Sequence, residues 1–500
     1  MLTVHVRISD AATGKPTPAR VRFFDASGTL RMPFGRLTEF ATEAGVDVGG
    51  QVRIGASRFA YIDGACEVRL PPGPVTVEVH KGPEYSPLCR EVTLGPGKIA
   101  LRLALERWTD LRAEGWYSGD TRCLYLTPHA ALLEGAAEDL AVVNLLAAER
   151  SPALGVPAAV SNLAAFSGTK SCLESPGHLV AVNTLNVHPL LGTVALLDSH
   201  RPVFPLRSGA PGPDDWSVAD WCDQCHRKRG LVVWPHLPRM STDAPQGEGL
   251  AALLLGKIDA FEVSYFDKPE PEVLGDWYRL LDSGLHLPLV GGSGKDSNAI
   301  ALGSVRTYAR LEDGQTFGYA TWIDAVKAGR TFVTNGPLLT MTADGFGPGS
   351  VLTLTPEGRP IPVRIEAKRT VPIDRVELLL NGAIVASKET SGNRQSAVLE
   401  TELLPTSSAW LAARCWGKDR LPDGQCVYAH SSPIYLKNGG PLLPPPESFA
   451  PLLAVLDRTL DWVVREAHCE TEPQRNHLLD VLRAGRSRLL PIGAASVIKG

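Results

Sequence analysis

Apolar and polar residues alternate along roughly the first hundred residues of the chain. The segments TVHVRI (3–8) and ARVRFF (19–24) place every second side chain on one face, which is the period of a half-buried strand. Clusters of turn-forming residues, such as DAATGKP, DASG and LPPGP, separate these short segments. The pattern predicts a small antiparallel β-sandwich over residues 1–106.

The middle of the chain has a different pattern, in which near-continuous apolar runs alternate with segments of helical spacing. GLVVWPH (230–236) is followed by the helical GEGLAALLLGKI, the strand-like DAFEVSYF, the helical PEVLGDWYRLLDSG and the strand-like LPLVGGSG. Buried strands that alternate with helices indicate parallel strands covered by helices. We therefore expect an α/β barrel or sheet over residues 107–340.

The alternation of apolar and polar residues returns after residue 340. The segments PVRIEAKR and DRVELLLNGAIVAS predict a second β-sandwich over residues 341–437, with a hairpin turn at Asn381–Gly382. GGPLLPPPES predicts a proline-rich linker over residues 438–446. Apolar residues at helical spacing then predict a two-helix tail over residues 447–500 that packs against the body.

Composition and charge narrow the classes of partner. The 500 residues are 44% hydrophobic and 21% charged, with a net charge of -4, so no basic field attracts nucleic acid or an anionic membrane. No apolar run approaches the ~20 residues that a membrane span needs, and the N-terminus has no secretory signal pattern. The nine scattered cysteines indicate reduced thiols and a cytoplasmic location. Small molecules remain as the expected partners, and the oligomeric state stays open.

Polar residues follow several of the predicted central strands. In parallel α/β folds the carboxyl ends of the strands meet at the ligand-binding edge. Carboxylates and imidazoles at such an edge are ligands for zinc, manganese or iron, and they also act as general acids and bases. The candidates from the strand ends are Asp120, Arg122, Glu174, His178, His236, Glu262, Lys295 and Asp296.

A family resemblance adds to these candidates. The segments WYSGDTRCLYLTP, AAEDLAVVNLL, SPGHLVAVNT, GLVVWPH, LVGGSGKDSNAIALGSVRTYARL and WIDAVKAGRTFVTNGPLL resemble the CehA/McbA-type metallohydrolases of the PHP (polymerase and histidinol phosphatase) superfamily, over residues 107–437. The resemblance implies a distorted β/α barrel that binds divalent metal ions and hydrolyses phosphoesters or other esters. The first 106 residues resemble transthyretin-like or carboxypeptidase-regulatory-like modules.

The family's metal-binding motif is only partly kept. Its opening Gly-Asp-x-His-x-His has Arg122 and Leu124 in place of both histidines. Leu124 has no lone pair, and Arg122 places a fixed cation where a metal ion would lie. Asn144, Leu145 and Gly294 stand at further ligand positions, and Asp296 stands at the position of a histidine.

Two readings of this motif stay open. In one, Glu174, His178, His236 and Asp296 hold one divalent ion of zinc, manganese or iron. In the other, the pocket is metal-free. Arg122 either forms an internal ion pair with Asp120 or Glu174, or binds a carboxylate or phosphate of a ligand.

The first functional hypothesis is a metal-dependent hydrolase. In it, His236 is a ligand and catalytic residue, Asp296 is a ligand or general base, and Arg122 or Lys295 clamps an oxyanion or phosphate. Asp120 and Asn298 join Arg122 and Lys295 as substrate-binding residues. The second hypothesis is a non-catalytic ligand-binding or assembly protein on the same scaffold.

One further motif, WCDQCH (221–226), matches redox and haem-attachment patterns. It lies within a predicted helix that leads into a strand, whereas a thioredoxin motif opens a helix. We therefore interpret Cys222 and Cys225 as structural cysteines.

Overall fold

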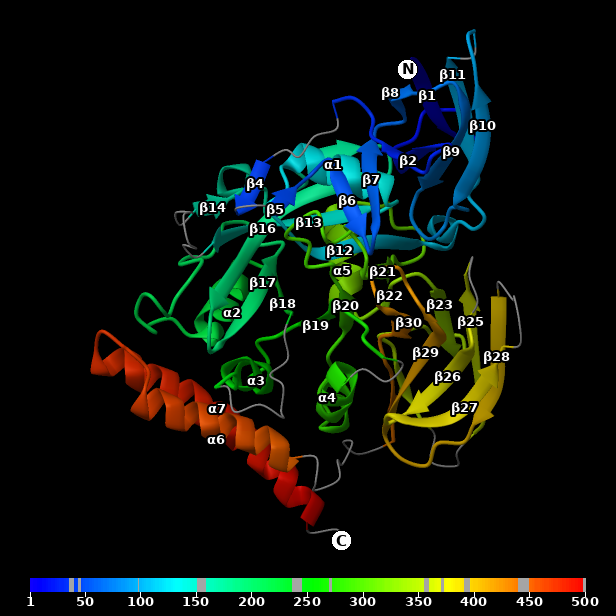
Figure 1. Ribbon diagram of the computed structural model, residues 1–500. Helices are drawn as coiled ribbons and strands as arrows, with labels where there is room; N and C mark the ends of the chain where they lie inside the picture. Colours follow the sequence, from blue (N-terminus) through cyan, green and yellow to red (C-terminus); the bar gives the residue numbers. More distant parts are fainter. Residues whose placement is uncertain are drawn as a thin grey trace.

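The computed structural model describes residues 1–35, 40–43, 46–97, 99–150, 159–235, 245–268, 272–354, 359–369, 373–390, 396–438 and 449–497. These residues form an N-terminal sandwich, a central unit, a C-terminal unit and a helical tail (Figure 1).

The N-terminal sandwich consists of two sheets around one apolar core. One sheet has the strand order β11-β1-β8, and the other has the order β10-β9-β2-β7-β6, with β3 beside β2. Val4, Val6 and Ile8 of β1 are buried while the residues between them face outward, so the predicted strand is confirmed. The strands are β1 (Leu2–Asp10), β2 (Ala19–Asp25), β3 (Leu30–Arg31), β4 (Phe40–Glu43), β5 (Val46–Val48), β6 (Gln51–Ile54), β7 (Ser57–Ile62), β8 (Ala65–Leu70), β9 (Gly73–His80), β10 (Leu88–Leu94) and β11 (Ala100–Leu105).

The central unit contains a mixed sheet. Its elements are the short helix η1 (Leu111–Glu114), β12 (Trp116–Leu124), α1 (Pro128–Ala137), β13 (Val142–Arg150), β14 (Ala159–Ser161), η2 (Leu163–Ala165), β15 (Leu173–Ser175), β16 (His178–His188), β17 (Gly192–Leu197), α2 (Val218–Arg227), β18 (Leu231–Trp234), α3 (Glu248–Leu254), β19 (Ala260–Val263), α4 (Glu272–Asp282), β20 (Leu289–Gly291), β21 (Arg306–Arg310), α5 (Tyr319–Lys327) and β22 (Thr331–Thr334). β12, β13 and β16 pair in parallel, as do β18, β19 and β20. By contrast, β17 runs antiparallel to both of its neighbours, and β21 runs antiparallel to β12 and β22.

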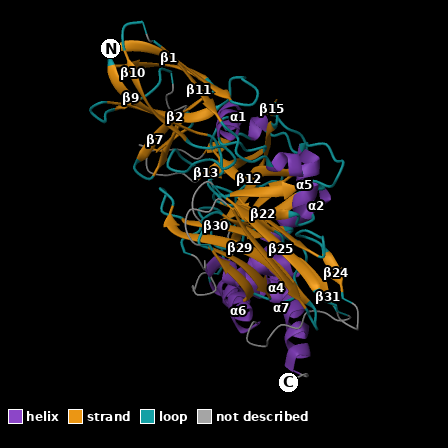
Figure 2. Ribbon diagram, turned by 90° about the vertical axis from the view of Figure 1, so that its right-hand side faces the viewer, coloured by secondary structure: helices purple, strands orange, loops and turns teal. Residues whose placement is uncertain are grey.

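The predicted fold class, a β/α barrel between two sandwiches, is wrong. Strands hold 43% of the residues and helices 20%, and strands dominate the view in Figure 2. The physical reason lies in the connections between strands. Parallel neighbours need a long crossover, whereas β16 and β17 are joined by a tight turn that pairs His188 with Gly192. The apolar runs are buried strands, and β18, β19 and β20 are parallel as predicted, whereas β17 and β21 run antiparallel to their neighbours.

The C-terminal unit shares hydrogen bonds with the central sheet, because β22 pairs with β30. Its smaller sheet, of order β23-β25-β28, packs on the larger sheet over a common apolar core. The predicted hairpin at Asn381–Gly382 is confirmed, since it joins β26 to β27. The strands are β23 (Leu338–Ala343), β24 (Val351–Thr353), β25 (Ile361–Lys368), β26 (Arg375–Leu380), β27 (Ala383–Glu389), β28 (Ser396–Leu403), β29 (Ala409–Arg420), β30 (Cys426–Ser431) and β31 (Ile434–Lys437).

The two predicted tail helices are confirmed as α6 (Phe449–Arg465) and α7 (Glu472–Val497). They lie side by side along α3 (Figure 1, lower left). Their apolar residues join the core formed by α2, α3 and α4, and the Thr459 hydroxyl accepts a hydrogen bond from the Gly247 amide. The predicted linker at 438–446 lies almost wholly outside the described residues. Within the described part of the chain, no helix combines the length and the apolar character that a membrane crossing requires.

Gly119 of β12 lies directly against an aromatic side chain. A Cβ atom at this position would lie 2.5 Å from Cζ2 of Trp322 in α5, and the Trp322 indole is fixed by a hydrogen bond to the Tyr117 carbonyl. The glycine of the GDTR motif is therefore required for packing.

We expect Gly119→Ala to lower the free energy of unfolding by about 1–3 kcal/mol, because the buried ring cannot move aside without strain. The matched control is Gly275→Ala in α4, where no atom lies within 4 Å of an added Cβ; it should leave stability unchanged or raise it by up to ~1 kcal/mol. Urea unfolding measures both variants. Equal stability of the two would contradict the packing role of Gly119.

Candidate functional site

The residues predicted to bind metal do not come together in the described structure. Glu174 is exposed in β15 and accepts a hydrogen bond from Ser171, and Asp296 is exposed in the loop after β20. His236 lies outside the described residues. Among those that are described, no three His, Cys, Asp or Glu side chains form a group that could hold a metal ion.

His178, the fourth predicted ligand, is committed to an internal contact. Its Nδ1 lies 2.6 Å from the Leu140 carbonyl oxygen. Burial and the nearby Arg112 guanidinium lower the pKa of His178 to about 4. The imidazole is therefore neutral at physiological pH, and the donors described here do not form a set that fits a divalent ion.

Arg122 forms an internal ion pair, but with neither of the predicted partners. Its Nε donates to Glu262 Oε1 at 2.7 Å, and the Thr121 hydroxyl donates to Glu262 Oε2 at 2.6 Å. Both Arg122 and Glu262 are buried. The Glu262 carboxylate, from β19, therefore supplies the charge that balances the guanidinium.

Asp120 is an anchor for the loop that follows β20. Its carboxylate accepts hydrogen bonds from the amides of Arg122, Ser293 and Gly303 and from the Ser293 hydroxyl. Burial raises the pKa of Asp120 to about 6 although these four donors oppose the shift. The carboxylate therefore fixes the start and the end of the 293–303 segment rather than facing a substrate.

Lys295 and Asn298 also serve this loop. The Lys295 ammonium is fully buried, donates to the carbonyls of Ser297 and Ile300, and lies 3.4 Å from Glu134 Oε2. The Asn298 side chain accepts from the Gly49 amide at 2.8 Å. Asp120, Lys295 and Asn298 thus hold the 293–303 loop together, and Asn298 fastens it to the N-terminal sandwich.

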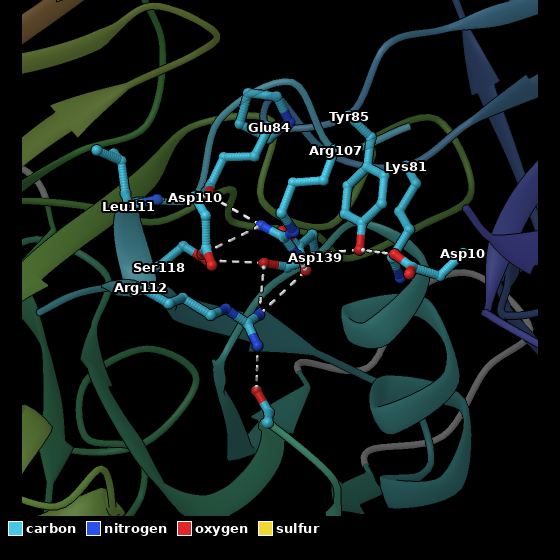
Figure 3. Close-up of polar contacts among 12 residues, drawn as sticks. Asp10, Lys81, Glu84, Tyr85, Arg107, Asp110, Leu111, Arg112, Ser118 and Asp139 are labelled. Carbon is cyan, nitrogen blue, oxygen red and sulfur yellow. Dashed lines mark hydrogen bonds and ion pairs between the residues drawn. The ribbon is translucent and has the colours of Figure 1, made fainter. Parts of the chain in front are cut away.

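The structure contains a buried ionic cluster that the sequence analysis did not find. Arg107, which follows the N-terminal sandwich, and Arg112 both donate to Asp139, at 3.0 and 3.1 Å (Figure 3). Arg107 also donates to Glu84 at 2.8 Å, and Glu84 accepts from Tyr308 of the central sheet. The charge-rich segment ERWTDLRAE (106–114), at the predicted domain boundary, is the sequence feature that could have indicated this cluster.

Burial and neighbouring charges shift the pKa values in this cluster in opposite directions. Burial alone would raise the pKa of Asp139, but Arg112 and Arg107 hold it below the ordinary value. Burial and the Asp139 carboxylate raise the pKa of Glu84. Asp139 therefore carries the negative charge that compensates the two arginines.

A cleft lies where the three larger units meet, and it has a volume of about 580 Å³. The N-terminal sandwich contributes residues of β2, β7 and β9. The central unit contributes the 299–304 segment, Arg306 and Asn335, and the C-terminal unit contributes Arg369 and residues 421–423. Ser264 and Ser293, just past the carboxyl ends of β19 and β20, also line it. The cleft therefore lies at the edge where a ligand was expected, although different residues form it.

Contact between the first and third units closes one side of this cleft. Gly55, in the turn between β6 and β7, touches the Pro422 carbonyl so closely that any Cβ atom at residue 55 would overlap it. Its positive φ of 59° also favours glycine. The N-terminal sandwich and the C-terminal unit are therefore in direct contact at this rim.

Comparison of the chain with protein-family models gave no match, and comparison with curated proteins gave none. The resemblance to PHP metallohydrolases thus stays a prediction from motifs.

The interpretation of Cys222 and Cys225 as structural cysteines agrees with their position in the fold. Both lie in α2 and are completely buried. Burial raises the pKa of each thiol well above its ordinary range, so neither is a reactive thiolate.

We expect Asp139→Asn to destabilise the protein by about 3 kcal/mol at neutral pH, because it removes a buried carboxylate shared by two half-buried arginines, Arg107 and Arg112. The pKa of Asp139 lies below its ordinary value in the folded protein, so its contribution is present above pH 3.8 and is lost as the pH falls below that value. Urea unfolding from pH 7 to pH 3 should show the stability difference between wild type and variant narrowing at the acid end. Asp110→Asn, which alters an exposed and more distant partner of Arg107, should cost less than ~1 kcal/mol. A pH-independent difference would contradict the assigned role.

We expect Arg122→Met to cost about 3–5 kcal/mol, since the Glu262 carboxylate would remain buried without its cation. Adding Glu262→Gln should recover part of this loss, because the second change removes the stranded charge. Arg310→Met, which breaks an exposed pair with Asp313, is the control and should cost less than ~1 kcal/mol. Thermal unfolding of the four proteins tests this, and a loss in Arg122→Met no larger than in the control would refute the internal pairing.

Proposed function

We propose that this protein is a small-molecule-binding protein whose ligand site is the cleft between the N-terminal sandwich, the 293–303 loop and the C-terminal unit. The observation that carries the proposal is the cleft itself. Its volume of about 580 Å³ falls within the ~300–1,000 Å³ of typical small-molecule sites. Aromatic, aliphatic and charged side chains line it together, as in sites that bury a ligand and orient it with a few polar groups.

The internal contacts of the strand-end residues favour binding over hydrolysis. A clamp for a reacting oxyanion needs donors that are free to face the substrate, whereas Arg122 pairs with Glu262 and Lys295 donates to main-chain carbonyls. Metal-dependent ester or phosphoester hydrolysis, with zinc, manganese or iron held in part by His236, stays a prediction from the family resemblance.

We also propose that the protein works in the cytoplasm. The nine cysteines all lie in the described part of the chain and none of them forms a disulfide bond, which suits a reducing compartment. Cell fractionation tests this, and recovery in an oxidising compartment would contradict it.

Filling the cleft tests the proposed function. Ala299 lines the cleft and is exposed, so Ala299→Trp should block the site and leave the fold intact. The probes are 1-naphthoate, 1-naphthamide and 1-naphthylmethylammonium, which share one aryl body and differ in charge. At least one should bind the full chain in isothermal titration calorimetry, and Ala299→Trp should weaken it at least about tenfold, the equivalent of ~1.4 kcal/mol.

Ala12→Trp, in an exposed turn away from the cleft, is the matched control and should bind like wild type. The proposal fails if none of the three probes binds, or if binding survives in Ala299→Trp. Turnover of 1-naphthyl phosphate or 1-naphthyl acetate with added zinc or manganese would favour the hydrolase instead.

A further inference from the structure

We infer that the natural ligand of the cleft is an organic anion, a carboxylate or a phosphate monoester carried on an apolar body. This inference rests on the proposed function and adds the chemical class of the ligand.

The first argument is the balance of charge in the lining. Three carboxylates, from Glu78, Glu138 and Asp423, face six cationic side chains. The cationic residues are Arg20, Arg22, Arg53, Lys81, Arg306 and Arg369. The protein as a whole has a net charge of -4, so this local excess of positive charge is specific to the cleft.

Arg20 and Arg22 are each paired with one of these carboxylates. Arg20 Nη1 binds both carboxylate oxygens of Glu138, and Arg22 binds Glu78 at 2.7 Å. These pairs use up two of the three carboxylates. Burial, together with Arg20 and Arg22, lowers the pKa of His80 to about 3, so this histidine adds no charge.

Arg306 keeps positive charge that its hydrogen bonds do not cancel, whereas burial lowers the pKa of Lys81 and the nearby Asp139 carboxylate opposes this shift. Arg306 is buried and donates to the carbonyls of Gly303 and Glu138, both at 2.8 Å. Lys81 donates to the carbonyls of Pro18 and Ala136. Carbonyl oxygens satisfy the donors but carry no net charge, and buried cations are ordinarily paired with an anion.

Arg369 brings a guanidinium from the C-terminal unit, across the cleft from the N-terminal sandwich. It is buried, and burial lowers its pKa to about 10 although Asp419 lies near enough to oppose the shift. A guanidinium in the lining can bind a carboxylate or phosphate through two parallel N–H bonds.

The apolar part of the lining indicates the rest of the ligand. Phe59 lies under the guanidinium of Arg22, at 4.7 Å, and Tyr265 is 49% exposed, which is high for a large aromatic residue. Ile54, Ala301 and Leu302 line the same space. These side chains suit a planar or aliphatic body next to the anionic group.

Probes of one size and different charge test the inference. In calorimetry with the full chain, 1-naphthoate or 1-naphthyl phosphate should bind at least about tenfold more tightly than 1-naphthamide, which is the effect of one charge-assisted hydrogen bond. Which of the two anions binds more tightly distinguishes a carboxylate from a phosphate ligand. Raising the salt concentration should weaken the binding of the two anions and leave the binding of 1-naphthamide unchanged.

Two arginine variants and one control locate the anion. Arg369→Met should weaken the binding of the anions at least about tenfold and leave the binding of 1-naphthamide unchanged. Unchanged binding of the amide also shows that the variant is folded. Arg53→Met, at an exposed lining position, gives a second test that does not disturb the core. Arg7→Met, exposed in β1 and outside the cleft, should bind every probe like wild type.

The outcomes separate the two proposals. Equal binding of anions and amide, or anion binding unaffected by both Arg369→Met and Arg53→Met, would overturn the anion inference while the proposed function stands. If none of the probes binds the wild-type protein, the proposed function itself is overturned.

Discussion

The arrangement of this protein depends on the Asp139 carboxylate, which lies between two arginines at the boundary of the first two units. Arg107 arrives at the end of the N-terminal sandwich and Arg112 belongs to the short helix that follows it. Because all three groups are largely removed from water, the pairing fixes the direction in which the chain enters the central sheet. The wall of the cleft formed by β2, β7 and β9 is positioned by this junction.

The second constraint is the continuity of the central and C-terminal sheets. Since β22 pairs with β30, the C-terminal unit is joined to the central sheet by main-chain hydrogen bonds. Tyr278 and Asp282 of α4 strengthen the joint through hydrogen bonds to His430 and Trp410. The two opposing walls of the cleft are therefore held by different means, an ionic cluster on one side and a shared sheet on the other.

Local patterns in the sequence predicted many individual helices, strands and turns. They could not predict features that depend on contacts between distant parts of the chain. The alternation in TVHVRI, the Asn381–Gly382 turn and the tail helices α6 and α7 follow from contacts between near neighbours in the chain. Strand direction depends on which strands pair, and no local pattern encodes that choice. The prediction of a β/α barrel consequently failed even where its strands were correctly recognised.

The same limit applies to the candidate site, because its local motifs were visible in the sequence and its long-range contacts were not. The loss of two histidines was visible at Arg122 and Leu124, but the partner of Arg122 is Glu262, 140 residues further along the chain. Likewise, the cleft combines side chains from all three units, so no single motif describes it. The sequence placed Lys295 and Asn298 at a strand end, but it could not indicate that these side chains support the 293–303 loop.

The contact of Gly55 with Pro422 bears on the order in which the protein is made. The first wall of the cleft is synthesised with β2, and the rim opposite it is not complete until the turn between β29 and β30 has left the ribosome. A chain that ends before this turn lacks the contact between Gly55 and Pro422 and the wall that residues 421–423 give to the cleft.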